Sequence, residues 1–518
     1  MRAILPGLSP ASGVLPTRPD VLVIGGGAAA LCAAIAARRA GASVLLLEEA
    51  PRWLRGGNTR HSRNLRVMHE SPSPLSVGVY PEAEFASDLQ RATGGTTDPA
   101  LARRLIQGSA EIADWLAGSG VLFQPTASGV LPPSRKTAFL LGGGTAMVNA
   151  LYATAERLGV MIRYGSAVRD PRIGQGRLDQ IDCQQGPDTQ LDVGARLRAT
   201  AGSGMSMPPG EPNHPQAGSD GGGRSQNESC RTWTLQPRTA IVCCGGSQAN
   251  RDWLRDQWGL AAEGFINRGT PFATGEVLHA LLRQGALPVG DPHGAYLVAV
   301  DARSPDDDGG IVTRVRCMPA GIVVDASGRR LHDEGGDTAS TRYALWGQRL
   351  AACPGQIAYL ILDARGLREA PPSLYPPLAA ESIAGLAARL EIPAAALAET
   401  LARYNAAVRP PAAGADDSDW RTDGLEPPKS RHARPLIEPP FGAWPMRPGI
   451  TFTYFGIAVD ADTRVRLHDG GTVENLFAAG MIMAPNLIGR GYVSGLALTI
   501  GCVFGRIAGA EAARHARG

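Results

Sequence analysis

The stretch Asp20–Ala50, DVLVIGGGAAALCAAIAARRAGASVLLLEEA, decides the fold of this chain. Its opening VLVI is a short apolar run that ends in glycines, which predicts a buried parallel strand. The following Ala-rich run stops at Gly41 and predicts a helix with a glycine stop. SVLLLEEA then predicts a second strand. The stretch therefore forms a complete βαβ unit near the start of the numbered sequence.

The turn between the first strand and the helix carries the pattern G-x-G-x-x-A, formed by Gly25, Gly27 and Ala30. Such glycines let the backbone pass close to a pyrophosphate, while the helix N-terminus supplies amide donors and a positive dipole end. Glu48 ends the second strand, where its carboxylate suits the hydroxyls of an adenosine ribose and would repel a 2′-phosphate. We therefore expect a dinucleotide here. The expected contacts are Gly25, Gly27, Ala29, Ala30, Glu48 and Glu49.

Two later segments, residues 55–64 and 475–480, favour FAD over a nicotinamide dinucleotide. RGGNTRHSRN, residues 55–64, has a glycine pair that lets a loop lie against a flavin. RTAIVCCGG, residues 238–246, is a further strand that runs into glycines. NLFAAG, residues 475–480, is a return strand, as expected when a long cofactor spans the domain. The further expected contacts are Gly57, Asn58, Thr59, Gly245, Gly480 and Met481.

Composition indicates a globular protein with more than one core. The chain has 518 residues, of which 44% are hydrophobic and 19% charged. That length predicts two domains or one large domain with an insert. A formal net charge of +3 does not suggest nucleic acid as a partner. The eight Cys show no metal or iron–sulfur spacing, so we expect no metal and free thiols in a reducing compartment.

Several other segments have clear patterns. Residues 81–120 predict two helices, one of which opens at Pro99, and residues 382–408 and 494–516 also predict helices. Residues 184–233 are rich in Gly, Pro, Ser and Asn, which predicts a disordered insert in a β-hairpin region. The first 20 residues do not form a signal peptide, and we find no uninterrupted apolar run that would span a bilayer. We expect a cytoplasmic protein, or one held peripherally at the inner membrane through a partner.

At these motifs the sequence resembles the fumarate reductase and succinate dehydrogenase flavoprotein superfamily. The resemblance includes the opening βαβ unit, GGGTAMVNAL at 142–151 and NLFAAGMIMAPNLIGRGY at 475–492. Two segments, RHSRNLR at 60–66 and HDEGGDTASTRYALWG at 332–347, look most like the tricarballylate dehydrogenases. They also look like the flavoprotein part of aerobic precorrin-3B synthases.

The resemblance implies an α/β fold, with a Rossmann-like FAD-binding domain that is split by an inserted α+β capping domain. The first part of the FAD-binding domain would be residues 18–285, the cap 286–440 and the return segment 441–518. In the membrane complexes of the superfamily a His after the glycine pair links the flavin covalently. Asn58 stands at the matching position here, so non-covalent FAD is implied. His61 is a nearby candidate for flavin contact.

The resemblance also implies catalytic residues. Arg342, in STRYALWG, matches an Arg that transfers the substrate proton, and Arg490, in IGRGY, is the counterpart of an Arg that clamps a carboxylate. A substrate-binding His of the superfamily is missing from TFTYFGIAVD, residues 451–460, which argues against plain fumarate or succinate. The expected substrate-binding residues are Tyr296, Tyr454 and Tyr492.

The implied function is an FAD-dependent dehydrogenase that oxidises tricarballylate, or a similar small polycarboxylate, to its unsaturated product (cis-aconitate). Electrons would pass to a separate acceptor, a membrane-associated iron–sulfur protein. One alternative is a flavoprotein of cobalamin synthesis, which would need a wider cleft for a corrin precursor. Another is a flavin electron-transfer subunit without its own substrate, whose function would survive replacement of Arg342.

Overall fold

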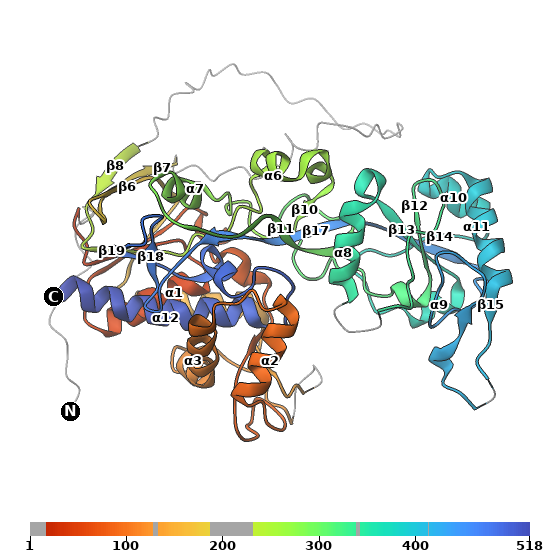
Figure 1. The fold of residues 1–518 in the computed structure, drawn as a ribbon, viewed down its shortest axis with the longest axis horizontal. Helices are drawn as coiled ribbons and strands as arrows, with labels where there is room; N and C mark the ends of the chain where they lie inside the picture. The colour runs from red at the N-terminus through yellow and green to blue at the C-terminus, as the bar shows by residue number, and fades with distance from the viewer. Residues whose placement is uncertain (1–16, 128–132, 187–230, 338–341, 413) are drawn as a thin grey trace, which may run out of the picture.

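The computed structural model describes residues 17–127, 133–186, 231–337, 342–412 and 414–518. Its elements gather into two lobes side by side along the longest axis (Figure 1). We call the lobe that holds both described chain ends the main lobe, and residues 322–440 the cap. The predicted insert lies largely outside the described residues, but Gln185 pairs with Arg231 across strands β7 and β8, so the edges of that segment are strand.

The main lobe is built on a six-stranded sheet with the order β18-β19-β9-β1-β2-β5. All neighbours are parallel except the edge strand β18, as the βαβ reading of the sequence predicted. The central strands are fully buried, which explains their unbroken apolar runs. The strands are β1 (Val21–Ile24), β2 (Val44–Glu48), β5 (Met161–Tyr164), β9 (Thr239–Val242), β18 (Arg464–Arg466) and β19 (Thr472–Ala478).

Helix α1 (Ala28–Arg39) packs along helix α12 (Leu496–Arg517), the last helix among the described residues (Figure 1). Their backbones nearly touch: a Cβ on Gly505 would lie 2.3 Å from the Ala29 carbonyl oxygen, and one on Gly509 would lie 2.2 Å from that of Ala33. Contrary to the sequence expectation, α12 is long and apolar enough to cross a membrane. In this fold, however, 72% of its most apolar window is buried, and it serves as a core helix.

The remaining elements of the main lobe surround this core. Asp98 caps one helix at the predicted Pro99 start by accepting hydrogen bonds from Ala100 N and Leu101 N, each at 2.9 Å. The helices are α2 (Glu82–Thr93), α3 (Pro99–Ala117), α4 (Gly143–Arg157), α6 (Arg251–Trp258) and α7 (Glu276–Arg283). The strands are β3 (Asn64–Arg66) paired with β4 (Thr137–Phe139), and the antiparallel sheet of β6 (Ser166–Gly174), β7 (Arg177–Gln185) and β8 (Arg231–Leu235).

A second sheet joins the two lobes. Strand β17 (Phe441–Ile457) pairs with β13 and β14 in the cap through its first residues and with β11 (Pro288–Asp301) through the rest. The predicted cap, residues 286–440, therefore begins just before β11, earlier than the lobe formed by residues 322–440, and it ends just before β17. The other strands are β10 (Ile266–Asn267), β12 (Ile322–Asp325), β13 (Ala358–Leu362), β14 (Leu378–Ala380), and the separate pair β15 (Val408–Arg409) and β16 (Arg421–Thr422).

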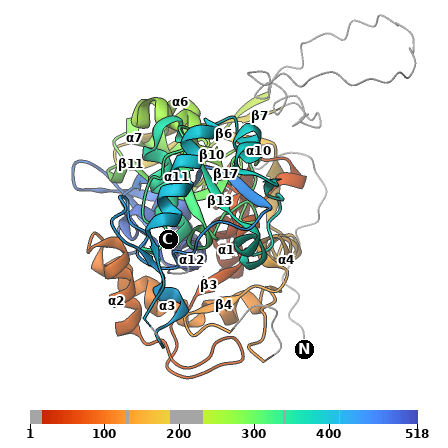
Figure 2. The ribbon, with the colours of Figure 1, turned by 90° about the vertical axis from the view of Figure 1, so that its right-hand side faces the viewer.

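Helices cover the cap sheet (Figure 2). The sequence predicted one helical stretch over 382–408, but the structure has two helices there. The break follows Glu391, whose φ is +56°, and Pro393 then starts the second helix. The cap helices are α8 (Arg342–Ala352), α9 (Ala364–Glu369), α10 (Ile383–Leu390) and α11 (Ala394–Ala407).

Candidate active site

A cavity of about 280 Å³ opens at the carboxyl ends of β1, β2 and β9 and reaches strand β17. Its two ends have opposite chemistry. We call the part around Gly25 and Glu48 the adenosine end. We call the part around Arg63, Arg268 and Arg314 the cationic end.

The glycines of the adenosine end are required by close contacts. Gly25 has a φ of +107°, and a Cβ there would lie 2.6 Å from the Cys243 carbonyl oxygen on the neighbouring strand. A Cβ on Gly26 would lie 2.1 Å from both the Glu48 Oε2 and the Tyr152 hydroxyl. The G-x-G-x-x-A pattern predicted contacts at Gly25 and Gly27 but passed over Gly26, the middle glycine of the GGG run. All three glycines line the cavity, so backbone forms this wall.

Glu48 is the buried acid of the adenosine end. Burial raises the pKa of its carboxyl to about 7, and the Ala50 N–H, which donates to Oε1 at 2.8 Å, offsets only part of that effect. Hydroxyl donors from a ribose would stabilise the charged form. Glu49 also lines the cavity, and its carboxylate lies 3.6 Å from Arg169.

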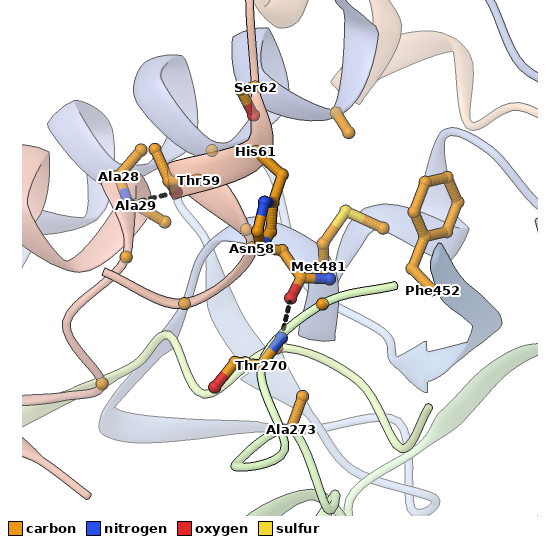
Figure 3. Close-up of a pocket in the computed structure, with 18 of the residues that line it drawn as sticks. Ala28, Ala29, Asn58, Thr59, His61, Ser62, Thr270, Ala273, Phe452 and Met481 are labelled. Atoms are coloured by element: carbon orange, nitrogen blue, oxygen red, sulfur yellow. Dashed lines mark hydrogen bonds between the residues drawn. The ribbon is translucent and has the colours of Figure 1, made fainter. Parts of the chain in front are cut away.

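The N-terminus of α1 faces the same space. The Ala28 N–H donates to Thr59 Oγ1 at 2.9 Å (Figure 3), and Ala29 lines the cavity beside it. Ala30 was also expected to contact the cofactor. The structure places it outside the cavity wall, fully buried in the core, where its small side chain packs the helix on the sheet.

Asn58 ties three separate segments together at the middle of the cavity. Its Oδ1 accepts a hydrogen bond from the Thr270 N–H at 2.9 Å (Figure 3), and its Nδ2 donates to the Thr451 carbonyl oxygen at 2.9 Å. The other predicted contacts of this region all line the cavity; they are Gly57, Thr59, Gly245, Gly480 and Met481. Gly480 has a φ of +81°, and a Cβ there would lie 2.9 Å from that of Ala29.

His61 lines the cavity as part of a charged cluster. Its Nε2 lies 2.6 Å from Asp308 Oδ1, and Arg60 Nη2 donates to both oxygens of the same carboxylate at 2.7 Å. Burial alone would raise the pKa of Asp308, but the hydrogen bonds from His61 and Arg60 outweigh it and lower that pKa. Asp308 therefore holds the loop after β11 onto the segment that carries Asn58.

The cationic end brings together three guanidinium groups from distant parts of the chain. Arg63 follows the Asn58 loop, Arg268 follows β10, and Arg314 lies in the segment between β11 and β12. Among the described residues, no carboxylate lies within 4.0 Å of any of them. Aromatic rings complete the wall, namely Tyr296, Tyr343, Phe452 and Tyr492. Sequence reasoning selected none of the three arginines, and only Arg63 belongs to a segment it quoted for the resemblance.

Two of the three predicted substrate tyrosines line the cavity. Tyr296 and Tyr492 do so with ring centroids 4.7 Å apart. Tyr454 lies outside the lining, and its hydroxyl donates to the Gly491 carbonyl oxygen at 2.6 Å. Tyr454 thereby supports the turn that presents Tyr492.

The two predicted catalytic arginines do not line the cavity. Arg342 starts α8 and its Nη1 donates to the Arg316 carbonyl oxygen at 3.2 Å, although its neighbour Tyr343 is part of the wall. Arg490 is exposed, and its Nε donates to the Thr93 carbonyl oxygen at 2.8 Å, which anchors it to the end of α2. The catalytic roles of both residues stay predictions.

No metal site is evident in the part of the chain that the structure describes. No group of three His, Cys, Asp or Glu side chains there could hold an ion, and the described cysteines are all free. Cys243 and Cys244 line the cavity wall, and burial raises the pKa of each thiol.

The cavity suits an extended dinucleotide, because a glycine wall, a helix N-terminus and a buried acid follow one another along it. A sequence profile of the FAD binding domain matches residues 20–175 and 222–492. The chain belongs to the FAD binding domain family. FAD is thus the cofactor, and the residues of the adenosine end and the Asn58 segment would hold it. The family is one of oxidoreductases.

Relatives of this FAD binding domain chain include enzymes that act on carbon–carbon double bonds. It is 26% identical over 516 residues to NADH:fumarate oxidoreductase of Klebsiella pneumoniae (strain 342), covering 96% of this chain and 48% of that protein. It is 23% identical over 512 residues to the cytochrome fumarate reductase of Shewanella frigidimarina, covering 96% and 77%. The chain spans about half the length of the first of these relatives.

Solved structures share the fold. An open flavocytochrome c3 fumarate reductase superposes with a TM-score of 0.68 at 20% identity, covering 97% of this chain and 79% of that one. A 3-ketosteroid Δ1-dehydrogenase of Sterolibacterium denitrificans superposes with a TM-score of 0.70 at 16% identity, covering 96% and 100%. These matches confirm the predicted α/β fold with a parallel-sheet FAD-binding domain.

Proposed function

We propose that this protein is an FAD-dependent dehydrogenase that removes two hydrogens from adjacent carbons of a small polycarboxylate. Tricarballylate is the first candidate substrate, with cis-aconitate as the product. The observation that carries the proposal is the cationic end, where three guanidinium groups line the cavity beyond the adenosine end. Arginine forks match carboxylates bidentately, so this end favours an anion with several carboxylate groups.

Bound FAD supplies the hydride acceptor for such a reaction. The guanidinium groups of Arg63, Arg268 and Arg314 would hold the carboxylates and stabilise the charge that develops on the adjacent carbon as its proton leaves. The walls formed by Tyr296, Tyr492 and their aromatic neighbours would exclude water and strengthen those interactions. Arg342, which lies next to the wall residue Tyr343, remains the residue that we propose for proton transfer. Because a guanidinium is already charged, it would take up the substrate proton only as it passes one of its own protons to another group.

The names of the relatives support a reaction at a carbon–carbon bond. The fumarate reductases act on a dicarboxylate, and a further relative is a 3-oxosteroid 1-dehydrogenase of Mycobacterium tuberculosis, 28% identical over 216 residues, covering 36% of this chain and 38% of that protein. A neutral steroid would leave the charges of the cationic end uncompensated, which favours an acid as the substrate here.

The cofactor must be reoxidised after each turnover. We propose that a separate membrane-associated iron–sulfur protein accepts the electrons, and that the chain works in the cytoplasm or peripherally at the inner membrane through that partner.

The test is the visible flavin spectrum of the purified holoprotein under anaerobic conditions, recorded before and after adding tricarballylate, succinate or a 3-ketosteroid. Bleaching with tricarballylate but with neither of the others is the expected result. An unchanged flavin band with tricarballylate would reject it as the substrate and bring the corrin-precursor alternative forward. Bleaching with the steroid alone would contradict the polycarboxylate class.

A further inference from the structure

Buried cations elsewhere in this chain are compensated by groups of the protein itself. In the cap, Arg330 Nη2 lies 2.5 Å from Glu334 Oε2, and both side chains are almost fully buried. Lys429 Nζ donates to two backbone carbonyl oxygens, each at 2.7 Å, and burial lowers the pKa of Lys429 to about 8 against the nearby charge of Glu334, which raises it. In the main lobe, Arg66 Nη1 lies 3.1 Å from Asp88 Oδ2. This pattern is expected, because an unpaired buried charge is costly.

Arg268 breaks this pattern. It is only 7% exposed and lines the cavity. Its Nη1 donates to Thr451 Oγ1 at 2.6 Å and its Nε donates to the Gly310 carbonyl oxygen at 3.2 Å, and both acceptors are neutral. The rest of its guanidinium has no partner among the described residues, so part of the fork stays available to a ligand.

A second guanidinium adds to the charge at this place. Arg314 also lines the cavity, where its Nε donates to the Ile311 carbonyl oxygen at 3.1 Å and its guanidinium carbon lies 4.5 Å from the Tyr343 ring centroid. Burial, and then the charge of Arg314, lower the pKa of Arg268 to about 10. Both effects disfavour the charged form, and a carboxylate bound beside the two groups would offset them.

Two features of β17, a glycine and a threonine hydroxyl, hold the Arg268 side chain in position. A Cβ on Gly449 would lie 2.8 Å from Arg268 Cδ, so the glycine makes room for the side chain to pass β17. Thr451 holds the guanidinium through Oγ1 while its carbonyl oxygen accepts the Asn58 amide. One residue of β17 therefore positions both the cofactor-side Asn58 and Arg268.

We propose that Arg268, supported by Arg314, is the residue that binds a substrate carboxylate and makes the enzyme select anionic substrates over neutral analogues. This inference rests on the proposed function, because it names the residue by which that site recognises its polycarboxylate. Thr451 acts as a positioning residue that orients the fork.

The experiment uses the FAD-loaded full chain and measures the perturbation of the flavin spectrum by tricarballylate and by its neutral triamide, together with kcat/KM for any compound that is oxidised. We expect Arg268→Gln to weaken tricarballylate binding roughly 10- to 100-fold, as for a lost charged hydrogen bond, and to abolish the preference for the acid over the triamide. Arg268→Lys keeps the charge without the fork, so its affinity for tricarballylate should fall between those of the wild type and Arg268→Gln.

Two further variants secure the interpretation. Thr451→Val removes the hydroxyl but keeps the carbonyl oxygen that Asn58 needs, so it should raise KM more than it lowers kcat and keep the FAD content. Thr451→Val also keeps the proposal testable if Arg268→Gln does not fold. Arg389→Gln, at an exposed arginine of α10, is the matched control and should change nothing.

The outcomes separate this inference from the proposed function. If the wild type binds tricarballylate and Arg268→Gln does not, the inference holds even if no polycarboxylate is oxidised, and only the proposed reaction then fails. Equal binding by wild type and Arg268→Gln, with turnover intact, overturns the role of Arg268 and leaves the proposed function standing. A wild type that binds no polycarboxylate overturns both.

Discussion

The two ends of the cavity recognise charge in different ways. The adenosine end is mostly backbone: glycines, the first amides of α1 and the ends of parallel strands, with Glu48 as the polar side chain that completes it. The cationic end is made of side chains carried by segments more than 200 residues apart, such as Arg63 and Arg268. A backbone site depends on local conformation, whereas a side-chain site depends on how distant segments pack. The two ends should therefore respond differently to substitution.

The largest expected effect is at the adenosine end. Gly25→Ala places a Cβ 2.6 Å from the Cys243 carbonyl oxygen and forces a non-glycine residue into a φ of +107°, so the protein should purify without bound FAD. Absorbance at the flavin band relative to protein absorbance measures this. Gly470→Ala, at a φ of +89° with nothing within 4 Å of the added Cβ, is the matched control and should keep its FAD. If Gly25→Ala purified with bound FAD, the glycine turn would not be the part of the cavity that binds the cofactor.

The second effect concerns the cationic end alone. Arg314→Gln removes one guanidinium that lines the cavity, so tricarballylate binding should weaken by roughly tenfold while FAD content stays unchanged. Titration of the holoprotein followed by the flavin spectrum gives both values. Loss of FAD in this variant would mean that the two ends are not independent.

The third effect is the pH dependence of cofactor binding. In the protein without cofactor, burial raises the pKa of Glu48 to about 7, and ribose hydroxyls should lower it again by stabilising the carboxylate. Binding then releases a proton, so FAD affinity should rise with pH by at most about tenfold per pH unit. The affinity should stay constant above about pH 7. Fluorescence titration of the apoprotein with FAD tests this, and Glu48→Gln should flatten the profile.

The same carboxyl affects the stability of the apoprotein. The native state keeps its proton to a higher pH than the unfolded chain, whose pKa is near 4.5, so the contribution of Glu48 to stability falls as pH rises from about 4.5 to about 7. Above that range the loss is constant. Glu48→Gln should remove this part of the pH dependence in denaturant unfolding of the apoprotein.

The smallest effect is expected at the Asp308 cluster, which joins the segment after β11 to the Asn58 loop. The side chains of Arg60, His61 and Asp308 are 16%, 24% and 27% exposed, so Asp308→Asn should cost only about 1 kcal/mol. Hydrogen bonds lower the pKa of Asp308, and its contribution should therefore be lost as the pH falls below about 4. Thermal unfolding at two pH values measures this, and a stability change equal at both would contradict the charged contact.

The contrast between the ends also explains what the sequence could predict. The β1-α1-β2 unit, the Pro99 helix start and the glycine wall follow from periodicity and turn chemistry within about 30 residues of chain. Asn58 was selected for its place after a glycine pair, and the structure puts it on the cavity wall. Pro393, which starts the second helix, could be read from the sequence. The helical spacing of apolar residues on both sides of it nevertheless predicted one continuous helix.

The cationic end could not be predicted in the same way. Arg268 follows a two-residue strand and belongs to no motif, and only the path of β17 brings Thr451 beside it. Tyr454 and Tyr492 were both predicted to bind the substrate. The direction of alternate residues on β17 and the hydrogen bond to Gly491 give them different places.

The packing of α1 against α12 has a consequence for how the protein is made. Residues 28–39 emerge from the ribosome before the whole cap, whereas the strand and helix that complete their core, residues 472–517, emerge after it. The cap elements are contiguous in the chain and can associate first. The cap can therefore fold before the cofactor domain is complete, and α1 stays without its packing partner until α12 has been synthesised.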